Sequence, residues 1–169
     1  KAGQPAQEQF GHLLGRLLRE EVPDAVHDHP AVRAGHHLGV DPDEHAVPHA
    51  VFGYPEVGGV GLTQEECREQ GYKVLVGYSD YIDCAKGYAM GEEDGLVKVI
   101  VDRDSRRILG AHIVGPHAAI LVQQIVYLMN AGDQTYLPLA RSQCIHPALS
   151  EAVVRAFGSL HDPDHHHDH

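Results

Sequence analysis

The feature that most constrains the fold is a segment, residues 117–130, that is apolar on nearly all sides. A helix with this pattern must be covered on more than one side, because it has no wide polar face to turn toward water. In a domain of this size a sheet covers one side, and a second subunit is a natural cover for the other. The segment therefore predicts a helix at a subunit interface. Its apolar residues are Ala118, Ile120, Leu121, Val122, Ile125, Val126, Leu128 and Met129.

Four other segments have the composition or the alternation of β-strands. A polar turn at residues 102–105 joins the last two strands and predicts an antiparallel hairpin. Strands, a hairpin and then helices, in this order, predict an α+β fold: an antiparallel sheet with helices packed on one face. The strand segments are residues 49–53, 73–81, 96–101 and 108–114.

Shorter segments connect these elements. Residues 63–66, Thr-Gln-Glu-Glu, have the sequence of a capping box, which predicts a helix over residues 64–70 closed by Gly71. Another short helix is predicted near Thr135, with Pro138 in its first turn. A glycine-rich segment predicts a flexible turn, since its spacing matches neither the P-loop nor the dinucleotide-binding fingerprint. Its glycines are Gly58, Gly59 and Gly61.

Residues 144–157 carry the candidate catalytic groups. Pro147 suits the first turn of a helix, where its missing N–H costs nothing. His146 would then precede the helix and Glu151 would follow one turn further in, close enough to hold the imidazole in one tautomer. The alternative is that His146 is a cap or a surface residue. Helical spacing of Leu149, Val153 and Phe157 predicts that one face of this helix packs inward.

The charge and the cysteine content of the chain exclude several classes of protein. Twenty-four acidic against thirteen basic residues give a formal charge of −11, which argues against a nucleic-acid partner. No apolar run reaches the ~20 residues that span a bilayer and no signal peptide opens the chain, so a cytoplasmic protein without a membrane partner is expected. The cysteines form neither a disulfide framework nor a metal knuckle, and all three are expected to be reduced and structural. For Cys144 a buried free thiol is expected rather than a redox thiol. They are Cys67, Cys84 and Cys144.

The two ends are rich in histidine. Residues 5–21 predict an amphipathic helix and residues 23–44 an irregular segment, so residues 1–45 form an N-terminal region before a domain over residues 46–160. Residues 161–169 predict a disordered tail, whose imidazoles and carboxylates either bind zinc, copper or nickel or have only opportunistic metal affinity. The N-terminal histidines that could gather around a metal are His27, His29, His36 and His37.

Six segments, in this order, resemble the C-terminal dimerisation domain of the FAD-dependent pyridine nucleotide–disulfide oxidoreductases. That family includes dihydrolipoamide dehydrogenase, mycothione reductase, glutathione reductase and mercuric reductase. The resemblance covers about residues 46–160. Its segments are Pro48–Phe52, Pro55–Glu56, Val60–Thr63, Gly95–Lys98, Arg107–Gly115 and His146–Glu151.

The resemblance implies a homodimer in which His146 of one subunit is the acid–base at the flavin and redox thiols of the other. Glu151 orients the imidazole, and Pro147 shapes the backbone that meets the partner's flavin site. A thiolate is the reactive form of such thiols, and an imidazole lets a proton leave and return near neutral pH. Cys144 stands where many members carry a second His, which favours the mycothione reductase branch.

The flavin domain, the CxxxxC redox disulfide and the nicotinamide domain of the family do not occur in these residues. The chain is therefore expected to be part of a longer FAD- and NAD(P)H-dependent enzyme that reduces a disulfide or a metal ion. No cofactor is expected to bind tightly to this chain, and no activity is expected from it alone. The alternative is a stand-alone homodimerising or metal-binding module derived from the same domain. A hydrolase that uses Ser150 or Cys144 is disfavoured, because residues so close along one chain rarely converge into a catalytic constellation.

Overall fold

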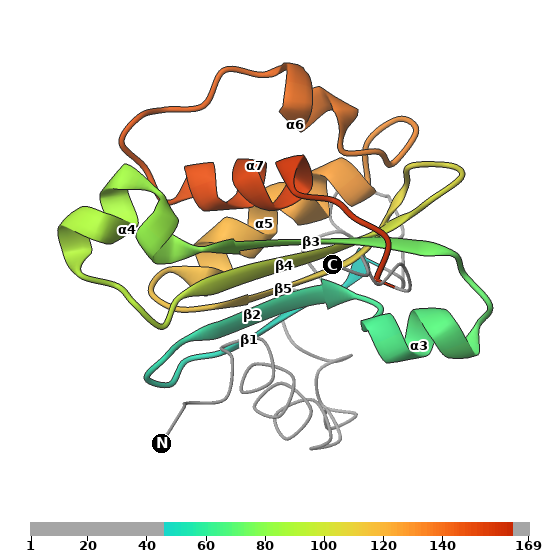
Figure 1. Ribbon diagram of the computed structural model, residues 1–169. Helices are drawn as coiled ribbons and strands as arrows, with labels where there is room; N and C mark the ends of the chain where they lie inside the picture. The colour runs from blue at the N-terminus through green and yellow to red at the C-terminus, as the bar shows by residue number, and fades with distance from the viewer. Residues whose placement is uncertain (1–45, 164–169) are drawn as a thin grey trace, which may run out of the picture. The chain divides into compact units, whose positions relative to one another are not determined.

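The centre of the fold is a five-stranded sheet in which every neighbouring pair of strands is antiparallel (Figure 1). The computed structural model describes residues 46–163. The order across the sheet is β1-β2-β5-β4-β3, so the predicted hairpin of β4 and β5 lies in its middle. The strands are β1 (Pro48–Val51), β2 (Val57–Gly61), β3 (Val74–Asp80), β4 (Leu96–Asp102) and β5 (Ile108–Val114).

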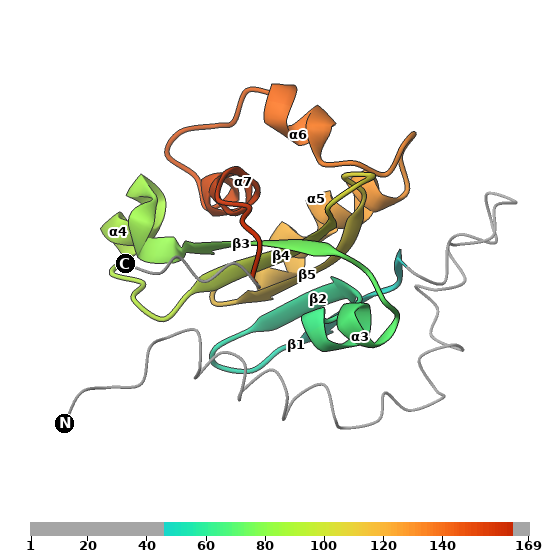
Figure 2. The ribbon, with the colours of Figure 1, turned by 45° about the vertical axis from the view of Figure 1, so that its right-hand side comes forward.

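Two helices cover one face of this sheet, as Figure 2 shows from a second side. Helix α5 (Ala118–Met129) packs on β1, β2 and β5, and helix α7 (Ser150–Gly158) packs on β3 and β4. The α+β fold predicted from the sequence is confirmed. The shorter elements are α3 (Gln64–Glu69), the 3-10 helix η3 (Tyr81–Asp83), α4 (Ala85–Met90) and α6 (Leu137–Arg141).

Short sequence motifs account for most of the positions at which the helices and strands begin or end. The capping box closes the start of α3: the Thr63 hydroxyl accepts from the Glu66 N–H at 3.2 Å, and the Glu66 carboxylate accepts from the Thr63 N–H at 2.7 Å. Gly71 follows that helix with a φ of 79°, and Pro138 lies in the first turn of α6, both as predicted. In residues 46–163 no helix combines the length and the apolar character needed to cross a membrane.

The predicted flexible turn at the three glycines is wrong, because these residues form strand β2. A Cβ on Gly58 would lie 2.8 Å from the carbonyl oxygen of Ala118, and one on Gly59 would lie 2.5 Å from Nε2 of His49. The glycines therefore let helix α5 and the His49 ring approach the sheet closely. The density of glycines indicated a flexible turn. In the fold, their missing side chains instead allow close packing against the strand.

The start of α7 also differs from the prediction. Pro147 was expected in the first turn, but the helix begins at Ser150, and the His146–Pro147 peptide bond is cis. The Glu151 carboxylate accepts a 3.0 Å hydrogen bond from the N–H of Ala148. This side-chain bond satisfies a backbone N–H where a helical turn was predicted.

Helix α4 and η3 were not predicted, because elements of six and three residues carry too little periodicity. The predicted helix over residues 5–21, the irregular segment to residue 44 and the histidines beyond His161 lie outside the described residues.

The segment after α7 returns to the outer edge of the sheet. His161 pairs with Val76 of β3 through two backbone hydrogen bonds, of 2.9 and 3.0 Å. The Ser159 hydroxyl donates to the Tyr78 carbonyl at 2.7 Å and accepts from the Tyr78 N–H at 2.9 Å. These contacts satisfy backbone groups that an edge strand otherwise leaves unpaired.

The start of α5 is capped from a distance. The Glu56 carboxylate accepts a 2.7 Å hydrogen bond from the N–H of Ala119, and the Glu56 carbonyl accepts from the Gly115 N–H at 2.8 Å. His117, at the local capping position, supplies no side-chain bond. The carboxylate thus satisfies a free N–H and meets the positive end of the helix dipole.

Replacing Glu56 by alanine is expected to lower the free energy of unfolding by about 1 kcal/mol, the usual effect of removing a helix cap. Urea unfolding of the full chain measures this change. Glu69→Ala removes an exposed carboxylate at the end of α3 and is the matched control, expected within about 0.5 kcal/mol of the parent. Equal effects of the two substitutions would refute the capping role.

Candidate acid–base site and exposed apolar helix

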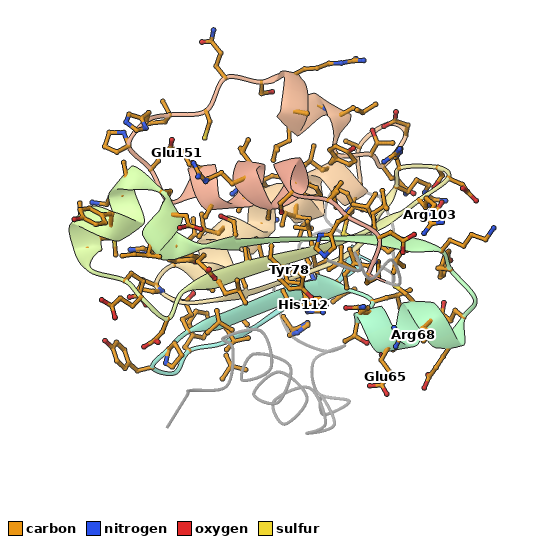
Figure 3. All side chains as sticks on the ribbon, viewed as in Figure 1. Glu65, Arg68, Tyr78, Arg103, His112 and Glu151 are labelled. Carbon is orange, nitrogen blue, oxygen red and sulfur yellow. The ribbon has the colours of Figure 1, made fainter. Side chains whose placement is uncertain are left out.

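The candidate catalytic pair is brought together by the start of α7. Nδ1 of His146 lies 2.9 Å from Oε1 of Glu151, and Oε2 of the same carboxylate accepts from the Ala148 N–H at 3.0 Å. Glu151 lies in the first turn of α7 (Figure 3), and His146 lies in the segment that leads into it. The carboxylate is therefore bound on both oxygens and fixed against its own helix.

The electrostatics of the pair favour an ionised carboxylate. The hydrogen bond with His146, and then that from the Ala148 N–H, hold the pKa of the Glu151 carboxyl below its usual value. A carboxylate only accepts hydrogen bonds, so Nδ1 of His146 carries the proton in this contact. Nε2 is then the nitrogen left for an incoming group. With 68% of its side chain exposed, His146 is open to a partner or a substrate.

The three cysteines separate into two environments. Cys67 and Cys84 are buried, and burial, followed by the charge of Glu66, raises the pKa of the Cys67 thiol to about 11. Cys144 is exposed, which contradicts the prediction, because it lies in the segment between α6 and α7 outside the core. Its sulfur lies 3.5 Å from the Ser150 hydroxyl.

Exposed apolar side chains surround the segment between α6 and α7. The sheet covers one side of α5, but Ile120 and Tyr127 on its other side are 70% and 67% exposed, and Ile145 is 76% exposed. A depression of about 410 Å³ lies between Ile120 and residues 147–150, and a second of about 350 Å³ adjoins Leu128, Cys144 and Ile145. The side of α5 that was expected to need a second cover is thus uncovered within residues 46–163.

A second group of polar side chains lies on the opposite face of the sheet, where it was not predicted. The strand register places His49, Gly59, His112, Lys98 and Tyr78 in one row across all five strands. Figure 3 shows His112 and Tyr78 on the sheet. The row could not be found from sequence, because it exists only once the strand order and register are set. In residues 46–163 no three His, Cys, Asp or Glu side chains are grouped as they would be around a metal ion.

This row makes stability depend on pH. His112 is 2% exposed, and its burial lowers the pKa of the imidazole to about 4, against about 6.5 in an unfolded chain. As pH falls from 6.5 to 4, protons bind the unfolded chain more than the folded one, so stability present above pH 6.5 is lost. Burial lowers the pKa of His49 in the same sense.

In metal-free buffer the loss through His112 is expected to approach roughly 3 kcal/mol at pH 4. Urea unfolding between pH 7.5 and pH 4 measures it, with His112→Asn expected to flatten the slope. His161→Asn, at an exposed histidine, is the control that should keep the slope. A parent chain whose stability is unchanged between pH 6.5 and pH 5 would contradict this assignment.

The fold and the site together define an α+β domain that presents an imidazole–carboxylate pair beside an uncovered apolar helix. The profile of one family, described as "pyridine nucleotide-disulphide oxidoreductase, dimerisation domain", matches residues 47–157. The chain belongs to this family and carries its dimerisation domain.

Similar proteins come from bacteria and archaea. Mycothione reductase of Mycobacterium tuberculosis is 44% identical over 119 residues, which are 70% of this chain and 26% of that enzyme. Dihydrolipoyl dehydrogenase of Haloferax volcanii is 34% identical over 147 residues, covering 80% of this chain and 31% of the enzyme. The chain therefore spans about a quarter to a third of the length of these relatives.

Solved structures give the same result. The flavoprotein disulfide reductase RclA of Escherichia coli superimposes with a TM-score of 0.62 at 29% identity, over 66% of this chain and 26% of that one. LpdA of Mycobacterium tuberculosis has a TM-score of 0.63 at 22% identity, over 74% of this chain and 28% of that one, and shows the shared fold.

Proposed function

We propose that this chain is the part of an FAD- and NAD(P)H-dependent disulfide oxidoreductase that joins two subunits and supplies His146 and Glu151 to the active site of the partner. The observation that carries the proposal is the 2.9 Å contact of an exposed imidazole with a fixed carboxylate, beside the uncovered face of α5. The chain is not active by itself.

The chemistry of the pair suits thiol–disulfide exchange. A thiol reacts as its thiolate, and the leaving thiolate must regain a proton. Nε2 of His146 takes and returns that proton, and the charge of Glu151 stabilises the imidazolium that forms meanwhile. Glu151 is thus a positioning residue that acts through His146.

The cofactors are expected to lie beside this chain and not to bind tightly to it. The family's name specifies a pyridine nucleotide, and RclA is named a flavoprotein. The resemblance to the family implies that the exposed His146 and Pro147 meet the partner's FAD. In residues 46–163 the glycine-rich segment is a strand rather than a phosphate loop. FAD when bound passes electrons between the nicotinamide and the redox thiols, and the chain's own task is to hold and move the proton. The substrate of the whole enzyme is a disulfide or a metal ion.

The face of α5 is the proposed homodimer contact. Light scattering on the full chain is expected to give a mass near twice 18.5 kDa. Ile120→Glu places a charge on the exposed apolar face of α5 and is expected to give a monomer. Tyr72→Glu places the same charge on an exposed tyrosine between α3 and β3 and should leave the dimer intact.

The same measurement separates the proposal from its alternative. A dimer that dissociates when a chelator is added would indicate a stand-alone metal-binding module. A dimer that survives both chelator and Ile120→Glu would show that the chains associate through another surface.

A further inference from the structure

We propose that His49 and His112 form a two-nitrogen copper site on the sheet face opposite α5 and α7. The site lies above Gly59 of β2, between β1 and β5. It is separate from the His146–Glu151 pair, and it goes beyond the proposed function of the domain.

The geometry brings two imidazoles to one point. Gly59 is the direct neighbour of His49 on one side and of His112 on the other. Nε2 of His49 lies 2.5 Å, and Nδ1 of His112 lies 3.3 Å, from the position that a Cβ would take on residue 59. The missing side chain of Gly59 is what leaves room between the two nitrogens.

One of these nitrogens lacks a hydrogen bond within residues 46–163. Nε2 of His49 is buried and has no partner in that part of the chain, which is rare because an unpaired buried polar atom costs roughly 1–3 kcal/mol. A ligand that accepts its lone pair would remove that cost. The orphaned nitrogen is therefore the observation that points to a bound species above Gly59.

The second imidazole is already held as a metal ligand would be. Nε2 of His112 lies 3.2 Å from the carbonyl oxygen of Leu62, which only accepts, so the proton is on Nε2 and the lone pair is on Nδ1. Metal-binding histidines commonly donate their other N–H to a backbone carbonyl in this way. Burial lowers the pKa of both imidazoles and keeps them in the neutral form that binds metals.

The donor set favours copper. Two imidazoles are few donors for a metal site, and copper has the highest affinity per nitrogen among the divalent metals of the first transition row. The Lys98 ammonium, the next residue in the row, opposes any cation, but it is held toward Gln64 at 2.9 Å. The charge of Glu66 acts in the opposite sense on His112.

Paramagnetic broadening tests the site residue by residue. Copper(II) sulfate is titrated into the 15N-labelled full chain, and the amide signals of His49, Gly59 and His112 are followed. They are expected to disappear as the site fills, and to remain when His49 is replaced by alanine. His161→Ala, which removes an exposed histidine of the described region, should leave the broadening unchanged.

Two results would overturn the proposal. Broadening confined to the histidine-rich ends and to His146 would show that His49 and His112 hold no metal. Broadening at Gly59 that survives His49→Ala would place the metal elsewhere. Should His49→Ala disturb the other amide signals, Gly59→Ala gives the same test, because its methyl group fills the space between two intact imidazoles. Neither result depends on the dimer mass that tests the proposed function.

Discussion

Replacing His146 by alanine in the full-length reductase proposed above is expected to lower kcat by about 10²- to 10⁴-fold, the usual contribution of an acid–base group. The loss should fall on the step in which the thiols exchange with the disulfide, because this step needs the proton. Reduction of the flavin by NAD(P)H should continue. Stopped-flow absorbance of the flavin separates the two half-reactions.

Two variants give this experiment its controls. Glu151→Gln keeps an acceptor oxygen near Nδ1 but removes the negative charge, so its loss should be smaller than that of His146→Ala. Cys144→Ser changes an exposed side chain close along the chain and should leave the exchange step unchanged. If His146→Ala slowed flavin reduction and disulfide exchange equally, the imidazole would not be the acid–base of the exchange.

Replacing Gly77 by alanine is expected to destabilise the domain by about 3 kcal/mol, the upper part of the range for overpacking a core. Gly77 lies in β3 beneath α7, where a Cβ would overlap the carbonyl oxygen of Ala156. Backbone cannot rotate away as a side chain can, so α7 would have to move off the sheet. Urea unfolding measures the change.

The matched control is Gly158→Ala, at the last residue of the same helix. A Cβ there meets nothing within 4 Å, and alanine has the better helix propensity, so stability should hold or rise by up to about 1 kcal/mol. A Gly77→Ala chain as stable as this control would mean that α7 does not rest on β3 as described. Because α7 carries Glu151, its displacement should also weaken the His146 contact.

The parts of the fold that depend on neighbouring residues could be predicted from the sequence. Alternation in β3, the capping box of α3 and the hairpin of β4 and β5 are set within a few positions of the chain. The His146–Glu151 contact spans five residues at a helix start, so its partners could be predicted even though Pro147 lies outside the helix.

The remaining features depend on residues far apart in the chain. Glu56 caps α5 from 63 positions away from Ala119, and no local pattern marks such a pair. His49 and His112 lie on either side of Gly59 only because β2 lies between their strands. Gly59 shows the same limit of prediction from sequence. Whether a glycine lies in a turn or at a close contact depends on the residues that surround it in space.

The closure of the β3 edge by Ser159 and His161 has a consequence for assembly and for handling the protein. An open edge would invite a strand from another molecule and lead to fibres or mispaired oligomers. With these backbone groups occupied, growth of the sheet past β3 is blocked. A truncation or fusion made before residue 159 would reopen that edge, whereas one made after Asp162, which pairs with Arg103, would leave it closed.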